Sequence, residues 1–435
     1  MKKIQIEKPE KPDEVQEVKN ESVSAMASES RLPTQCPYRQ ALLLQQTLIS
    51  DKMRIAFLLG AGCPVSISIE DGESTRPLIP DINDLTAYVK SSLEKSTEFR
   101  SSFEIILKRL SGMGECPQNI ETILSHIRAL CDVAGNGLID GLSQKDLSNL
   151  DSEICKVITT AVEVELPTSN TPYHQLATWV RGIQRSHPIE IFTPNYDLLM
   201  EQAFEELRVP FFDGFVGSRH SFFDLNSIEQ DSLPSRWARL WKVHGSINWW
   251  RTSIGTVERR SQQTSGDRQM IYPSHLKYDE SRRMPYFAML DRLKGFLSDG
   301  QAVLITCGYS FSDQHLNDVI LQGLIGNPTA VCFGLIYGDL TQAGEAVKRA
   351  HKQPNLSLLA VNGAIIGTME RCWHAAEKTE HPLHGIAAKA GRLENRTESP
   401  ESSCKFLLGD FSAFGEFLAR QLVLGDDVKG ENINA

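Results

Sequence analysis

The stretch Thr193-Pro194-Asn195-Tyr196-Asp197 decides how the rest of the chain is interpreted. It follows the short apolar run at residues 189–192, which is typical of a buried strand, and it precedes a helical pattern at residues 198–207. A strand of this kind delivers an amide and a carboxylate to its carboxyl end. In an open α/β sheet that end is where ligands bind, so the stretch predicts a ligand site.

Other apolar runs end in the same manner. The runs at 55–59, 240–243, 302–307 and 356–361 are followed by Gly60-Ala61-Gly62, His244-Gly245, Gly308-Tyr309-Ser310 and Asn362, respectively. Because the carboxyl ends of parallel strands meet at one edge of a sheet, we expect these residues to converge on the edge that holds Asn195.

The alternation of strand and helix predicts an α/β fold, a Rossmann-like doubly wound parallel sheet. Helical stripes fill residues 81–186, which we interpret as an inserted helical subdomain. Residues 35–80 and 187–435 then form the Rossmann-like domain, and the polar residues 1–34 form a disordered tail. Loops are expected at residues 63–80, 253–268 and 375–402.

Composition excludes several classes of protein. A net charge of -10 gives no electrostatic footprint for nucleic acid over the whole chain. The apolar runs are shorter than the roughly 20 residues of a membrane helix, and the first residues lack the apolar core of a signal peptide. The nine cysteines contain no C-x-x-C pair, which argues against a zinc ribbon and a disulfide framework. We therefore expect a cytoplasmic protein with reduced thiols and no zinc.

Two residues are candidates for catalysis. A neutral imidazole such as His244 is a suitable general base near pH 7, although a structural histidine is the alternative. Asn195 does not titrate, but its amide can orient a water or a ribose hydroxyl. Its alternative role is to cap the following helix.

The remaining candidates are suited to binding. Glycines at 60 and 62 allow a ligand to approach the backbone closely, or they only form a tight turn. The amides after Gly308 and the Ser310 hydroxyl suit a phosphate, or they form an ordinary strand-to-helix turn capped by serine or aspartate. Asp197 is also a residue type that favours the first turn of a helix.

Together these motifs resemble the sirtuin-like fold, from about residue 55 to residue 362. The order is G-A-G-C, T-P-N-Y-D, H-G, G-Y-S-F-x-D and a strand ending in asparagine, and it is most similar to the bacterial sirtuin-like proteins of anti-phage defence. The resemblance implies that the NAD pyrophosphate contacts Gly60, Ala61 and Gly62, and that Gly308 and Ser310 bind phosphate. It implies further that Asn195 holds the attacking water or the nicotinamide ribose, that Asp197 recognises the carboxamide, and that His244 is the general base. Asn362 would bind the adenosine ribose.

The chain also departs from the pattern. Pro64 stands where the family commonly has a serine, which leaves Ser66 as the residue to take that role. The four zinc cysteines of deacetylating sirtuins are absent, and with them the module that helps to form a protein-substrate groove. Water is then the natural nucleophile.

The expected activity is hydrolysis of NAD+, with NAD as the substrate. Its glycosidic bond joins ribose to a cationic pyridinium, so nicotinamide leaves as a neutral molecule and needs no general acid. The resemblance implies homo-oligomers and a HerA-like hexameric ATPase as partner, with nucleic acid involved only through that partner. The tail and residues 253–268 are candidate docking segments. A protein deacylase and a non-catalytic scaffold that binds NAD or ADP-ribose are the alternatives.

Overall fold

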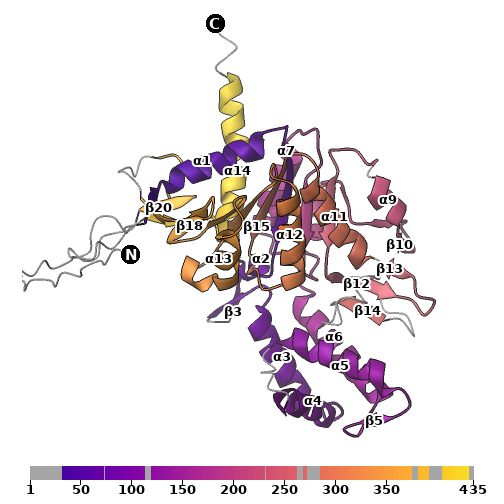
Figure 1. Ribbon diagram of the computed structural model, residues 1–435. Helices are drawn as coiled ribbons and strands as arrows, with labels where there is room; N and C mark the ends of the chain where they lie inside the picture. Colours follow the sequence, from indigo (N-terminus) through magenta and orange to yellow (C-terminus); the bar gives the residue numbers. More distant parts are fainter. Residues whose placement is uncertain are drawn as a thin grey trace, which may run out of the picture. The chain divides into compact units, whose positions relative to one another are not determined.

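The computed structural model describes residues 32–430, except 73, 113–118, 231, 262–267, 272–284, 375–380 and 391–403 (Figure 1). The predicted tail therefore lies almost entirely outside the described residues. Its last residues do not: Thr34 already pairs with Cys372 in a strand. The described residues from 33 onward belong to one compact unit, and the proposed division of that unit into domains stays a prediction.

Ten strands form the main sheet, in the order β1-β19-β18-β17-β16-β15-β2-β7-β11-β8. Their bounds are β1 (Thr34–Gln35), β2 (Arg54–Leu59), β7 (Glu190–Thr193), β8 (Phe211–Phe212), β11 (Ala238–Lys242), β15 (Ala302–Cys307), β16 (Val331–Leu335), β17 (Leu356–Leu359), β18 (Gly363–Ile366) and β19 (Met369–Trp373). In the order of the sheet, the seven neighbouring strands from β17 to β8 run parallel, and β18 and β19 extend the sheet beyond β17 with antiparallel pairing. The α/β fold with a mostly parallel sheet is confirmed.

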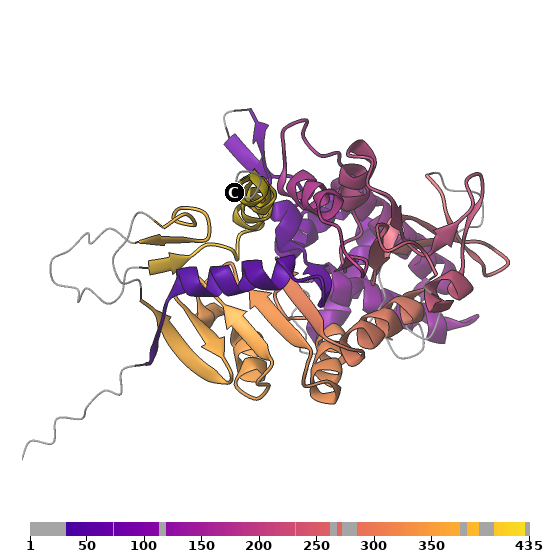
Figure 2. The same ribbon diagram turned by 90° about the horizontal axis from the view of Figure 1, so that it is seen from above.

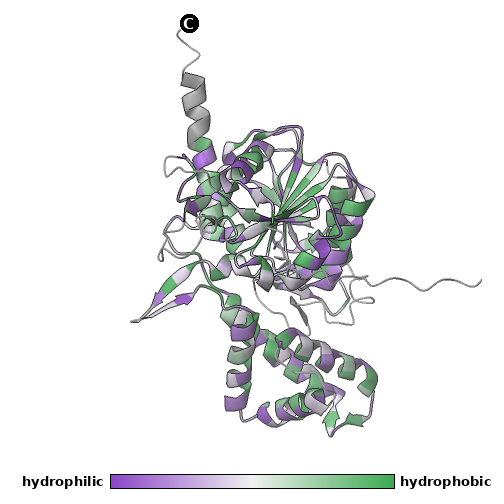
Figure 3. Cartoon of the chain, turned by 60° about the vertical axis from the view of Figure 1, so that its left-hand side comes forward, coloured by the Kyte–Doolittle hydropathy of each residue, from purple (hydrophilic) through white to green (hydrophobic). Residues whose placement is uncertain are grey.

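Both faces of the sheet are covered, which explains why its strands are continuous apolar runs. Ile55, Phe57 and Leu59 of β2 point into one core, and Ala56 and Leu58 point into the other. The first core is closed by α1 (Pro37–Ile49), α7 (Pro172–Gly182), α8 (Leu199–Glu206) and α14 (Phe411–Gly430). The second is closed by α11 (Tyr286–Ser298), α12 (Gln314–Gly326) and α13 (Gly344–Ala350). Figure 2 shows α1 crossing the strands, and Figure 3 shows hydrophobic residues along them.

The order of the strands creates a switch point beside β2. From β2 the chain proceeds to β7, β8 and β11 on one side of it, and then crosses to β15, β16 and β17 on the other. The carboxyl ends of β2 and β15 therefore flank the crevice where doubly wound sheets bind ligands.

Four helices of the insert follow β2, namely α3 (Ile82–Lys95), α4 (Arg100–Gly112), α5 (Ile120–Ala134) and α6 (Gln144–Val162). Asp81, Asn119 and Ser143 cap three of them through their side chains. A buried ion pair between Arg128 and Asp151, at 2.6 Å, joins α5 to α6. Gly135-Asn136-Gly137 follow the end of α5 and lead into a hairpin, β5 (Leu138–Ile139) and β6 (Leu142–Ser143).

All three predicted loops contain regular structure, and the described part of the loop at 375–402 includes a strand at residues 388–390. Residues 63–80 include the end of α2 (Gly62–Val65) and a hairpin of β3 (Ser68–Asp71) and β4 (Ser74–Pro77). Residues 253–268 include β13 (Val257–Arg259), which belongs to a second sheet with β9 (Phe215–Val216), β10 (Ser221–Phe223), β12 (Gly245–Arg251) and β14 (Arg268–Ile271). All three loop predictions were therefore wrong in part. These short strands form because they pair with a neighbouring strand, and their own sequence carries no strand pattern.

The smaller elements complete the fold. They are α9 (Leu225–Gln230), the 3₁₀ turn η1 (Leu340–Gln342), and the paired strands β20 (Ala388–Ala390) and β21 (Cys404–Phe406). Within the described part of the chain, no helix combines the length and apolar character needed to cross a membrane.

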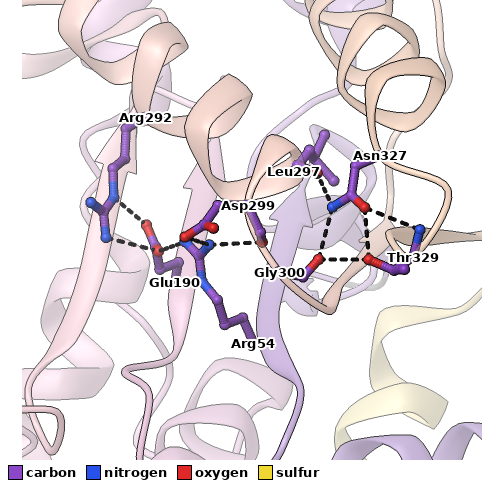
Figure 4. A network of polar contacts seen from close by, with 8 residues as sticks. All are labelled: Arg54, Glu190, Arg292, Leu297, Asp299, Gly300, Asn327 and Thr329. Atoms are coloured by element: carbon purple, nitrogen blue, oxygen red, sulfur yellow. Dashed lines mark hydrogen bonds and ion pairs between the residues drawn. The ribbon is translucent and has the colours of Figure 1, made fainter.

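The amino edge of the sheet is held by a buried polar network (Figure 4). Glu190, at the start of β7, accepts two hydrogen bonds from Arg292, at 2.9 and 3.0 Å, and one from the Trp241 indole at 2.8 Å. Arg54, at the start of β2, lies 3.7 Å from Glu190 and also binds the exposed Asp299. These residues join β2, β7, β11 and α11 at the end of the strands opposite the predicted site.

Candidate functional site

Asn195 is fixed to the end of β2 through short polar contacts. The Thr193 hydroxyl donates to the Leu59 carbonyl at 2.8 Å and accepts a hydrogen bond from the backbone N–H of Asn195 at 3.0 Å. The Asn195 side chain then donates from Nδ2 to the Gly60 carbonyl at 3.1 Å. Its amide oxygen is the group left for a ligand. The alternative that Asn195 caps α8 is not observed, because its side chain binds Gly60 and α8 begins after Leu198 without a capping side chain.

The glycines at the ends of β2 and β15 pack against each other, backbone to backbone. The Gly60 N–H donates to the Cys307 carbonyl and the Gly62 N–H to the Gly308 carbonyl, both at 2.9 Å. A Cβ atom on Gly62 would lie 2.8 Å from the Gly308 Cα. The glycines are thus required by the junction of two strands, and Ala61 and Gly62 remain exposed at its surface. The glycines thus have a structural reason to be there, and contact with a phosphate stays a prediction.

Asp197 is buried, with 6% of its surface exposed. Its Oδ1 accepts from the Leu199 N–H at 3.1 Å, at the start of α8, and its backbone carbonyl accepts a hydrogen bond from Lys242. Burial raises the pKa of the Asp197 carboxyl, and the nearby Lys242 ammonium opposes that effect. Lys242 in turn pairs with Glu201 at 3.1 Å. The carboxylate therefore has a structural role in α8, and the predicted carboxamide contact is untested.

Tyr173 of α7 is a neighbour of Asp197 that the sequence did not indicate. Its hydroxyl is buried and has no hydrogen-bond partner among the described residues. Burial raises the pKa of Tyr173, and the negative charge of Asp197 adds to the effect. An unsatisfied hydroxyl beside a carboxylate is suited to bind a small polar group of a ligand or a water.

His244 is paired with Asp313. Its Nε2 lies 2.8 Å from Asp313 Oδ2, and the two side chains are 14% and 15% exposed. His244 follows β11, and Asp313 precedes α12, so the contact joins the two sides of the switch point. The sequence pattern G-Y-S-F-S-D contained Asp313 only as a possible helix cap, and it gave no sign that this carboxylate would meet His244.

The loop that carries Asp313 is firmly held. Gly308 and Phe311 both have positive φ, at 62° and 56°, which is unusual for a phenylalanine. Buried Asn317 secures the loop: its Nδ2 donates to the Phe311 carbonyl at 2.7 Å, and its Oδ1 accepts from the Tyr309 hydroxyl at 2.8 Å. The backbone strain is offset by these contacts, and the result is a fixed position for Asp313.

The other predicted residues follow strands that end at the same edge, but their side chains bind the main chain or a neighbouring serine. The Ser66 hydroxyl donates to the Cys63 carbonyl at 2.7 Å, and the exposed Ser310 hydroxyl donates to Ser312 at 2.9 Å. Asn362 accepts from the Leu340 N–H at 3.0 Å. It follows β17, three strands from β2, which is about 14 Å at the usual strand spacing. Ser66, Ser310 and Asn362 stay predictions as ligand contacts.

No metal site is evident among the residues the structure describes, and the thiol beside the glycine turn is buried. No group of three or more His, Cys, Asp or Glu side chains there is placed to hold an ion. Cys63, the thiol nearest to the glycine turn, is buried and donates to the Cys307 carbonyl at 3.2 Å, and burial raises its pKa. It is therefore a packing residue.

The structure thus brings Gly60, Asn195, His244 and Gly308 to one edge at the switch point, and it adds Asp313 to them. The edge offers an exposed glycine turn, a fixed amide and an imidazole held by a carboxylate. Such a set can position a water molecule and accept its proton.

Comparison with known proteins identifies part of this region. A sequence-family model described as "SIR2-like domain" matches residues 189–351. No curated protein matches the chain. A solved structure described as "Structural Basis for the Mechanism and Regulation of Sir2 Enzymes" aligns over 69% of this chain and 86% of its own, with 9% identity and a TM-score of 0.29. The segment from β7 to α13, which carries Asn195, His244 and Asp313, is therefore similar to the SIR2-like domain.

Proposed function

We propose that the protein hydrolyses NAD+ to nicotinamide and ADP-ribose. The observation that carries the proposal is the convergence of Asn195 and the His244–Asp313 pair at the switch point of a doubly wound sheet. The match of residues 189–351 to the SIR2-like domain supports NAD as the substrate.

The chemistry makes modest demands on the protein. The pyridinium leaves as neutral nicotinamide, so the site has to orient a water molecule and take up its proton. Asn195 keeps an amide oxygen free to accept a hydrogen bond from that water, because its Nδ2 is bound to Gly60. His244 is the group that receives the proton. The glycine turn exposes backbone at Ala61 and Gly62, where a pyrophosphate can approach.

Hydrolysis is favoured over protein deacylation by the sequence. The chain has nine cysteines and no C-x-x-C pair, so it lacks the pattern of the zinc module that helps deacetylating sirtuins to hold a protein substrate. We further propose, on the resemblance alone, a homo-oligomer in the cytoplasm that acts in anti-phage defence together with a HerA-like ATPase. The chain has no G-x-x-x-x-G-K-[ST] motif, so ATP hydrolysis would come from the partner.

Two substitutions test the activity. Asn195→Ala and His244→Ala should each lower the rate of NAD loss by at least about 100-fold, because each removes a group that acts on the water. Chromatography of nicotinamide and ADP-ribose measures the rate, and circular dichroism checks the fold. Asn83→Ala and His351→Ala are matched controls on the exposed surface and should keep full activity. Full activity in both site variants would exclude the assignment.

Two additions to the same assay separate the alternatives. Nicotinamide release that depends on an acylated peptide would identify a deacylase. Tight NAD binding without product over hours would identify a non-catalytic scaffold. The HerA-like ATPase is added in a third arm, where a rise in NAD loss would support the partnership and no change would count against it.

A further inference from the structure

The contact between His244 and Asp313 bears on the protonation of the imidazole ring as well as on its position. We propose that Asp313 is a positioning residue that fixes the tautomer of His244 and thereby makes Nδ1 the atom that accepts the proton. This inference rests on the proposed function for its role in catalysis, and it names an atom that the proposed function leaves open.

The assignment of the proton follows from the contact. Asp313 Oδ2 lies 2.8 Å from His244 Nε2, an ion-pair contact within hydrogen-bonding distance. An ionised carboxylate only accepts hydrogen bonds, so a carboxylate at this distance favours the hydrogen on Nε2. In a neutral imidazole the other nitrogen, Nδ1, then holds the lone pair. Among the described residues the one polar contact of the His244 side chain is the ion pair of its Nε2 with Asp313, so Nδ1 is open to substrate or water.

The two oxygens of Asp313 have separate tasks. Oδ1 accepts from the Leu316 N–H at 3.0 Å and caps α12, while Oδ2 faces His244. A helix cap needs only the first contact. The second is directed to a histidine at the end of another strand, and the loop between Gly308 and Asp313 is held in an unusual conformation at Phe311. The geometry therefore assigns Asp313 a role beyond capping.

The substitution Asp313→Asn separates the two tasks. The Asn oxygen can retain the cap, which places the amide Nδ2 against His244. An amide N–H donates, so Nε2 would have to accept, and the hydrogen would move to Nδ1. The base would then have the wrong tautomer, and the corresponding exchange in a serine-protease triad lowers kcat by about 10⁴-fold. We expect kcat for NAD to fall by about 100-fold to 10⁴-fold with little change in KM.

Two further variants sharpen the comparison. Asp313→Ser keeps a capping oxygen but imposes no tautomer on His244, so it should lose less activity than Asp313→Asn. Asp318→Asn removes an exposed carboxylate from the same helix and should be unchanged. A purely structural role for Asp313 predicts the opposite order, because asparagine is the better mimic of aspartate in shape.

The tautomer is observed directly by ¹⁵N NMR of histidine-labelled, full-length protein, with His244 assigned from the His244→Gln variant. We expect hydrogen on Nε2 in the wild type and on Nδ1 in Asp313→Asn. The same tautomer in both folded proteins, or full kcat in Asp313→Asn, would overturn the inference. A tautomer exchange in a protein that does not hydrolyse NAD would support the positioning role and reject the proposed function, so the two failures are distinguishable.

Discussion

The junction of Gly60 and Gly308 shows how single residues set the distance between two strands. Substitution Gly60→Ala would place a Cβ atom 2.7 Å from the Tyr309 Cα, so backbone must move. Because two packed strand ends cannot shift cheaply, we expect a loss of about 1–3 kcal/mol in the free energy of unfolding. Urea denaturation measures it.

Gly295 offers the matched control, because it lies exposed in α11 and an added Cβ would meet nothing within 4 Å. Gly295→Ala should stabilise the protein by about 0.5–1 kcal/mol, since alanine is the better helix former. A Gly60→Ala variant as stable as the wild type would show that the junction is looser than the structure indicates.

Asp197 predicts a pH dependence of stability. Burial raises the pKa of its carboxyl in the folded protein above the value of about 3.9 expected when unfolded. Between these two values the folded state binds the proton more tightly than the unfolded state. Stability contributed by this group is therefore fully present at the acid end and is lost as pH rises through the folded-state pKa.

Asp197→Asn removes the titrating carboxyl, and with it this pH-dependent contribution to stability, while the amide oxygen can still accept from the Leu199 N–H. We expect the free energy of unfolding of the variant, minus that of the wild type, to increase between pH 4 and pH 8. Urea titrations across this range check it. Asp410→Asn is the control, because Asp410 makes the same type of contact, to the Ser412 N–H, at a more exposed helix start. A difference that stays flat or falls with pH would contradict the assigned cause.

At this scale the sequence predicted positions better than contacts. Asn195, His244 and Gly308 could be placed at strand ends because each follows an apolar run. The pairing of His244 with Asp313 could not be predicted, because it depends on where α12 begins relative to a strand on the other side of β2. The burial of Asp197 was hidden for the same reason, since Lys242 and Glu201 approach it from separate elements.

The network at the amino edge of the sheet predicts that stability and chemistry can be changed separately. Glu190→Gln keeps the shape of the side chain but leaves Arg54 and Arg292 without their shared charge. Breaking such a buried pair costs about 3 kcal/mol, at the low end of the usual range because both arginines are partly exposed. We expect this loss of stability in urea, with kcat for NAD unchanged at temperatures where the variant is folded.

Asp299 supplies a control within the same network. Its side chain is 86% exposed, so Asp299→Asn should change stability by less than about 1 kcal/mol. If Glu190→Gln lowered kcat as strongly as Asn195→Ala in the folded protein, the two ends of the strands would be coupled, and the separation argued above would be wrong.

Elements with a strong periodic pattern could be predicted, and elements defined by their partners could not. The helix at α11 and the strands β2, β15 and β16 have continuous or periodic apolar residues. By contrast, β13 lies in a polar segment and is a strand because Val257 pairs with Arg251 of β12. The antiparallel edge of β18 and β19 was missed because the chain after Asn362 looks like the end of a strand and gives no sign of a reversal.

At the scale of the whole molecule, the site is assembled from segments that are distant in the sequence. Gly60, Asn195, His244 and Asp313 come from four strand ends or helix starts, separated by the helical insert and by the second sheet. No single segment can form the site alone. A ligand bound there would contact residues on both sides of the switch point, so it should stabilise the compact unit as a whole.

ADP-ribose, the proposed product, tests this prediction without turnover. A ligand that binds only the folded state adds about 2.7 kcal/mol when present at 100 times its dissociation constant. We expect a single unfolding transition that moves to higher temperature as ADP-ribose is added, in the wild type and equally in His244→Ala, which removes the base and keeps the glycine turn. Differential scanning calorimetry records the transition, with ribose 5-phosphate as a control that lacks the pyrophosphate. A ligand effect confined to one part of a split transition would mean that the two sides of the sheet unfold separately, and no shift at all would remove the support for a dinucleotide site at this edge.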